Sequence, residues 1–152
     1  MKRIGIGALV VMMVAALCLS ATAGKPVVQA HGELWTEIHI AGQYFDIQFA
    51  FSVKDRGTND HGNISLRIFD HWTGKLVAVG ISTDVFDVYQ ADDGWVYFTA
   101  TFRVPRLDED YYLPLHIGAY LFWARDGGDG GADGFGMLGQ LLPILKGKVT
   151  VK

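Results

Sequence analysis

Three aspartates lie among glycines near the C-terminal end of the chain and have the chemistry of a metal site. The tract Ala124–Gly136 reads ARDGGDGGADGFG and contains Asp126, Asp129 and Asp133. Glycine costs about 0.5–1 kcal/mol relative to alanine inside a helix or strand, so a loop is expected. Calcium is bound by oxygen-rich loops, and these three carboxylates are the candidate ligands. The spacing matches neither the EF-hand nor the calcium-binding nonapeptide, so the alternative stays open that the aspartates hydrogen-bond their own backbone.

Aromatic side chains form a second candidate site. Strand alternation is expected to place Trp35, Tyr44, Trp95, Tyr97, Tyr120 and Phe122 on the sheet face opposite the core, and the first four of these are the candidate ligand-binding residues. Rings flanked by carboxylates and amides suit sugars, and an exposed patch of this kind marks an interaction surface. The alternative is that both faces of the sheet are covered.

A carboxylate pair is the candidate for catalysis. Glu37 and Asp46 are placed to face each other across two strands, and a deep pocket that joined them with His39 would indicate a small hydrolase. No nucleophile elbow, phosphate-binding loop or dinucleotide fingerprint occurs, so a non-catalytic role is favoured and no catalytic residue is assigned. The five histidines lack the spacing of a helical zinc site, and His71, beside Asp70, is expected to be a hydrogen-bonded turn residue. Calcium at the aspartate loop is the one cofactor considered.

The elements that must position these residues are strands. Residues 44–53 and 95–104 alternate apolar and polar side chains with a period of two, as a half-buried strand does. Within residues 76–88 the alternation loses its phase after Ser82-Thr83-Asp84, which predicts a bulge. About eight strands separated by turn signals predict an all-β fold, a single antiparallel β-sandwich or barrel.

The N-terminal segment has the features of a secretory signal peptide. Lys2 and Arg3 precede the apolar run Ile4–Leu19, and Ala21-Thr22-Ala23 is a small-x-small cleavage pattern. We therefore expect a signal peptide over residues 1–23 and one exported β-domain over residues 24–152, secreted or held in the cell envelope. Cleavage would remove Cys18, the single cysteine of the chain, and with it any disulfide.

Charge narrows the classes of partner. The formal net charge is −3, and it becomes −5 after cleavage because two of the thirteen Lys and Arg residues lie in the signal segment. No basic cluster is present, so nucleic acid is not an expected partner. The membrane is expected to be contacted only through the signal segment, if that segment stays uncleaved. A cell-surface protein or a glycan remains as the partner.

Six landmarks along the chain resemble the post-COAP-1 family of small secreted bacterial and archaeal domains. In chain order these are FAFSVK (49–54), HGNISL (61–66), DHWTG (70–74), WVYFTAT (95–101), DGGDGGADGF (126–135) and GKVTVK (147–152). The chain departs from the family where the loop lacks a proline and where Trp72 replaces a usual glycine. The resemblance implies a β-rich exported domain and carries no established activity.

The expected function is therefore that of a non-catalytic exported structural or interaction domain. A carbohydrate-binding module is the first alternative, which exposed Trp35, Trp95 and Tyr97 would favour. A small secreted hydrolase is the second.

Overall fold

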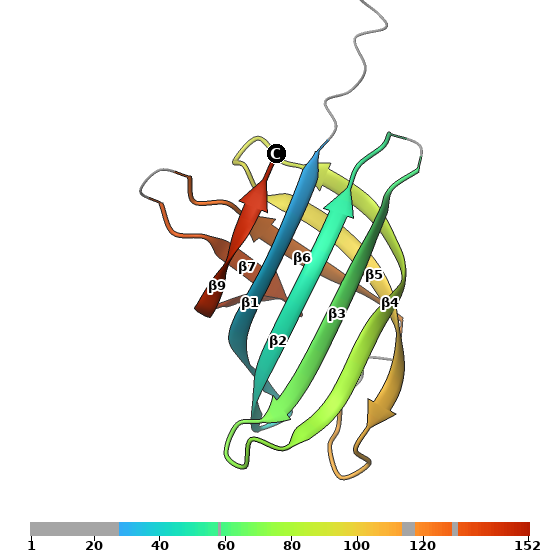
Figure 1. Ribbon diagram of the computed structural model, residues 1–152, viewed down its shortest axis with the longest axis vertical. Coiled ribbons are helices and arrows are strands. Elements are labelled where there is room, and N and C mark those ends of the chain that lie inside the picture. The colour runs from blue at the N-terminus through green and yellow to red at the C-terminus, as the bar shows by residue number, and fades with distance from the viewer. Residues whose placement is uncertain (1–27, 58, 114–117, 129–130) are drawn as a thin grey trace, which may run out of the picture.

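The computed structural model describes residues 28–57, 59–113, 118–128 and 131–152, and these residues form an all-β domain (Figure 1). The predicted signal peptide lies outside the described residues. Where the sequence predicts about eight strands, the described residues form nine. They are β1 (Gln29–Ile40), β2 (Gln43–Lys54), β3 (His61–Asp70), β4 (Leu76–Gln90), β5 (Val96–Leu107), β6 (Ala119–Arg125), β7 (Gly134–Met137), β8 (Gln140–Leu142) and β9 (Ile144–Val151).

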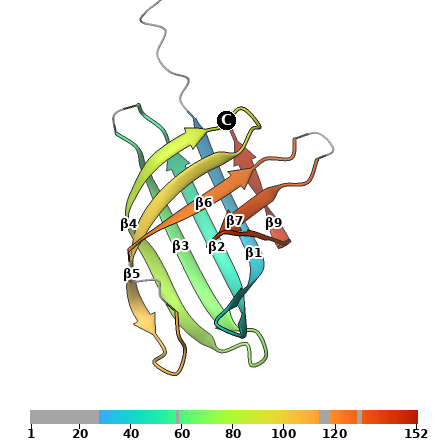
Figure 2. The ribbon, with the colours of Figure 1, turned by 180° about the vertical axis from the view of Figure 1, so that it is seen from behind.

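All nine strands belong to one antiparallel sheet. Strands β1 to β8 pair in chain order as a meander, and β9 returns to pair with the free side of β1, giving the order β8-β7-β6-β5-β4-β3-β2-β1-β9. The sheet curls so that β9, β1, β2 and β3 form one wall while β5, β6 and β7 cross behind them, as Figure 2 shows from the other side. The alternatives of sandwich and barrel are thus resolved as a nearly closed barrel.

The strand alternation of the sequence builds the interior. In β2 the predicted inward residues Phe45, Ile47, Phe49, Phe51 and Val53 are all buried. Full burial of such side chains stabilises the fold by about 1.5–3 kcal/mol each. The predicted core face of β2 is confirmed.

Phenylalanine rings join the two walls of the barrel. Phe49 of β2 lies 4.6 Å from Phe135 of β7 and 5.3 Å from Phe122 of β6, measured between ring centroids. Phe51 lies 5.3 Å from Phe98 of β5 in the same way. Tilted and stacked rings at these separations attract one another beyond the area that they bury. The curl of the sheet therefore closes around an aromatic core.

Strand β4 bends where the sequence predicts a bulge. Its pairing with β5 shifts register between Ser82 and Asp84, and again at Val79/Ile81 and Phe86/Tyr89. Asp87 has a φ of 54°, which is rare for a residue with a side chain. Bulges increase the local twist, and this fifteen-residue strand uses them to pass from one wall of the barrel to the other.

The loop between β6 and β7 closes the barrel at the free edge of β9. The N–H of Val149 donates to Asp133 Oδ2 at 2.7 Å, and the N–H of Val151 donates to Asp126 Oδ2 at 3.3 Å. The second oxygens bind the loop itself, since Gly127 N–H donates to Asp133 Oδ1 and Gly128 N–H to Asp126 Oδ1, both at 2.9 Å. Two carboxylates thus take the place of the carbonyl groups that a tenth strand would offer.

Replacing Asp133 tests this closure. Asp133→Ala is expected to lower the free energy of unfolding by about 1–3 kcal/mol, because part-buried N–H groups of β9 and the loop lose their acceptor. Urea unfolding measures the change. The matched control is Asp92→Ala in the exposed β4–β5 turn, which should unfold like the wild type. Equal stability of the two variants would contradict the closure.

Candidate functional site

The structure separates the four predicted aromatic ligands into two pairs. Trp35 and Tyr44 lie on the outer face of the β1–β2 hairpin, whereas Trp95 and Tyr97 lie at the start of β5 in the opposite wall. Tyr44 is 42% exposed, and the other three are half-buried. No single wall of the barrel therefore contains all four residues. The expectation that Tyr120 and Phe122 also face outward was wrong, because Phe122 is fully buried opposite Phe98 and Tyr120 packs against the core.

Trp95 packs against Arg125 and Gly134. The guanidinium group of Arg125 stacks on the Trp95 ring, and the Cζ atom of Arg125 lies 4.8 Å from the ring centroid. The Trp95 ring also covers Gly134, where any added side chain would overlap the indole. Trp123 covers Gly136 in the same way. These two glycines of the aspartate-rich tract are thus required by the rings above them.

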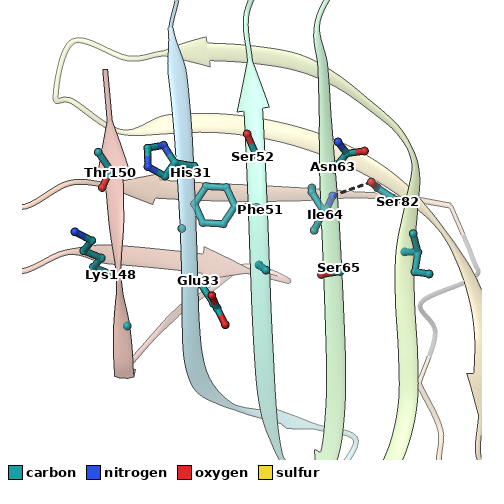
Figure 3. A pocket seen from close by; sticks show the side chains of 14 residues that line it. His31, Glu33, Phe51, Ser52, Asn63, Ile64, Ser65, Ser82, Lys148 and Thr150 are labelled. Atoms are coloured by element: carbon teal, nitrogen blue, oxygen red, sulfur yellow. Dashed lines mark hydrogen bonds between the residues drawn. The ribbon is translucent and has the colours of Figure 1, made fainter.

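A groove crosses the outer face of the other wall. It has a volume of about 700 Å³ and runs over β9, β1, β2, β3 and β4 (Figure 3). The strand register places Thr150, His31, Ser52 and Asn63 side by side in one row across the sheet. Alternation keeps these side chains on the outside, because their sequence neighbours face the core.

The next row gives the groove its floor and its charges. Lys148, Glu33, Ala50, Ser65 and Ile81 follow one another across the same five strands. The side chains of Ala50 and Ser65 are short, so they form a floor between the longer side chains of Glu33 and Lys148 on one side and Ile81 on the other. The outer wall therefore carries an elongated hollow with donors and acceptors along it.

Polar groups in the groove are left without protein partners. Within the described residues, no hydrogen bond or ion pair is made by the side chains of Glu33, Ser52, Asn63, Ser65 or Lys148. His31 Nδ1 is buried and has no partner either. Buried polar atoms are normally hydrogen-bonded, so an unpaired one at a groove indicates that an external molecule or water completes it.

A second cluster lies on the same outer face, near the β1–β2 turn. Glu37 and Asp46 are direct cross-strand partners, as the sequence suggested. The two-residue turn fixes this register, since Ala41 and Gly42 both have positive φ, at 50° and 84°. His71 completes the cluster from the β3–β4 turn.

The DHWTG turn holds His71 in place. Asp70 Oδ1 accepts hydrogen bonds from the N–H groups of Trp72 and Thr73 and from the Thr73 hydroxyl, at 3.1, 2.7 and 2.7 Å. These bonds hold the pKa of Asp70 below its ordinary value, with the Thr73 hydroxyl as the largest cause. The N–H of His71 donates to the carbonyl of Tyr44 at 3.2 Å, which fastens the turn onto β2.

The His71 ring contacts both carboxylates. Its Nδ1 lies 2.9 Å from Asp46 Oδ1 and 3.4 Å from Glu37 Oε2, and each of the three side chains is about one-third exposed. The hydrogen bond with Asp46 raises the pKa of His71 above 6.5, and the charges of Asp46, Glu37 and Asp70 act in the same direction. His71 is a hydrogen-bonded turn residue, as expected, and its side-chain hydrogen bond reaches Asp46 of β2.

The geometry does not assemble the hydrolase site considered from the sequence. His39 stacks on Tyr44 at 4.6 Å between centroids, whereas His71 contacts the carboxylates. Among the residues that line the groove, neither Glu37 nor Asp46 occurs. The pair therefore lies outside the groove, with His71 rather than His39 beside it.

The aspartate loop shows a structural role for two of its three candidate ligands. All four carboxylate oxygens of Asp126 and Asp133 accept backbone N–H groups, and Asp129 lies outside the described residues. Hydrogen bonds from Gly128 and then Val151 hold the pKa of Asp126 below its ordinary value. Calcium binding at this loop stays a prediction.

Sequence reasoning missed the cluster and the groove for different reasons. The Glu37–Asp46 pairing was readable from the hairpin, but His71 joins it only through folding of a turn that lies 25 residues from Asp46. The groove had a local signal that was overlooked, namely the small outward residues Ala50, Ser52 and Ser65.

Comparison with protein-family models, with curated proteins and with solved structures finds no match. The resemblance to post-COAP-1 therefore stays a prediction. Within the described residues, no helix has the length and apolar character needed to cross a membrane.

The protonation of His71 gives a pH-dependent prediction. The prediction applies to protein treated with a chelator. Because the pKa of His71 is higher in the folded state than in the unfolded state, its ion pairs with Asp46 and Glu37 stabilise the fold fully below about pH 6.5. This stabilisation is lost as the pH rises through the folded-state pKa of His71. The urea midpoint should fall over that range in the wild type and not in His71→Gln. Nuclear magnetic resonance should give a His71 pKa above 6.5 that Asp46→Asn lowers, whereas a wild-type value at or below 6.5 would contradict the assignment.

Proposed function

We propose that this chain is an exported, non-catalytic binding module whose groove across β9, β1, β2, β3 and β4 binds a glycan. The observation that carries the proposal is the row of unpaired polar side chains around a floor of small residues. The signal-like residues 1–23 and the landmarks shared with post-COAP-1 support export.

The shape of the groove suits an extended ligand. Neighbouring strands are about 4.8 Å apart, so the four steps from β9 to β4 span about 19 Å. A second hollow continues from it, lined by Gln48 and Arg67 and sharing Glu33, Ala50 and Ser65 with the groove. An oligomer of several units fits this surface better than a compact small molecule.

The groove combines a mostly apolar lining with separate hydrogen-bonding groups, which suits the apolar faces and the hydroxyl groups of sugars. Each sugar hydroxyl both donates and accepts a hydrogen bond, and the groove offers both functions in adjacent rows. Glu33 supplies a carboxylate acceptor and Lys148 an ammonium donor, while Asn63 supplies both kinds of group. With acid and base both present, no large charge of one sign selects a polyanion or polycation.

Trp35 extends this surface toward the hairpin end. It pairs across strands with Gln48, which lines the second hollow, and its ring lies 5.4 Å from Phe69. An indole that is half-buried and fixed by a neighbouring ring is a suitable platform for the apolar face of a sugar. Of the four aromatic residues that the sequence analysis proposed as ligands, Trp35 is thus the one that we assign to the glycan-binding surface.

Filling the groove tests the proposal. A glycan array of immobilised oligo- and polysaccharides is probed with the wild type and with Ser65→Tyr, which places a large ring on the outer floor without touching the core. The variant should lose at least about tenfold in affinity for the glycans that the wild type binds. The matched control Thr83→Tyr, an exposed β4 position outside the groove lining, should bind normally.

Two aromatic variants locate the face independently. Trp35→Ala should weaken binding, whereas Tyr97→Ala in the opposite wall should not. Absence of binding across the array, or equal binding by Ser65→Tyr and wild type, would overturn the proposal.

A further inference from the structure

We infer that Glu37, Asp46 and His71 form a binding site for one divalent transition-metal ion of the zinc class. The inference is independent of the glycan proposal, because the three side chains lie outside the groove lining. Sequence reasoning did not find this site, because its three ligands come from β1, β2 and the β3–β4 turn.

The three ligand atoms lie close to one another. Glu37, Asp46 and His71 each offer one atom, and these atoms lie within 4.8 Å of one another. Ligand atoms at about 2.0–2.2 Å from a tetrahedral zinc ion are about 3.3–3.6 Å apart. The distances from His71 Nδ1 to Asp46 Oδ1 and Glu37 Oε2, 2.9 and 3.4 Å, therefore need only small adjustments to share an ion.

The ligands are held before any ion arrives. The positive-φ turn of Ala41 and Gly42 fixes Glu37 opposite Asp46, and the Asp70 hydrogen bonds shape the turn that presents His71. A site that is already ordered loses little conformational entropy on binding. Rigid strands on two sides and a hydrogen-bonded turn on the third meet that condition.

The local charge favours a cation. Within the described residues, neither Glu37 nor Asp46 is paired with a lysine or arginine, and the nearby Lys75 pairs with Asp108 instead. With a neutral imidazole, the cluster carries two negative charges that one divalent ion would balance. Trp72 stands edge-on to His71 at 4.9 Å between centroids and shields one side of the ring.

The donor set selects the class of ion. An imidazole nitrogen with two carboxylate oxygens suits zinc and related transition metals, whereas calcium and magnesium prefer oxygen alone. The side chains are about one-third exposed, so water has access to the remaining coordination positions. The cluster is thus chemically distinct from the all-oxygen calcium site predicted at Asp126, Asp129 and Asp133.

Titration calorimetry tests the site directly. The protein is prepared without a histidine tag, stripped with a chelator and titrated with zinc chloride. We expect one zinc ion per chain in the wild type, loss of that binding in His71→Gln and Asp46→Asn, and binding within about twofold of wild type in two controls. The controls are His39→Gln, a neighbouring histidine on the same face, and Asp126→Asn in the aspartate loop.

Further measurements keep the test decisive. Circular dichroism and urea unfolding establish that the variants are folded. In a separate experiment on the wild type, cobalt(II) is bound in place of zinc, and the visible spectrum of the cobalt reports whether nitrogen and oxygen atoms ligate it. Zinc should also raise the Tm of the wild type but not of His71→Gln. No zinc binding by the wild type at about 100 µM, undiminished binding in folded His71→Gln, or loss of binding in His39→Gln would overturn the inference.

Discussion

The free edge of β9 is the constraint on which the rest of the barrel depends. A curled sheet whose two edge strands, here β8 and β9, do not pair exposes a row of backbone N–H groups, which is unstable and invites edge-to-edge association. Here Asp126 and Asp133 supply the missing acceptors from the β6–β7 loop. Because β9 is anchored on both sides, it extends the wall formed by β1, β2 and β3, and the groove has a fifth strand on which Lys148 and Thr150 stand.

This closure changes the meaning of the aspartate-rich tract. Its glycines allow the loop to fold back on itself and leave room for the rings of Trp95 and Trp123, while its acids bind β9. A composition that resembles a metal loop thus serves the backbone. The metal site that we propose lies where two strands and a turn bring a histidine beside two carboxylates.

The sequence predicted what is local and periodic. Alternation in β2 identified its five inward residues, and the loss of phase after Ser82 identified the bulge of β4. The partners that lie far apart in the chain could not be read in the same way. The bond between Asp133 and Val149 and the contact between His71 and Asp46 depend on how distant segments fold together, and the four candidate aromatics were separated by the curl of the sheet.

Both functional proposals concern the outer face of β9, β1, β2, β3 and β4. This face carries the groove, Trp35 and the cluster of Glu37, Asp46 and His71. The most direct measurement is a two-dimensional amide NMR titration with a glycan that the protein retains. We expect the amide shifts to concentrate at His31, Ser52, Asn63 and Ser65 in the groove. Shifts concentrated instead around Tyr89, Tyr97 and Trp123 in the opposite wall, or absent from both, would contradict this expectation.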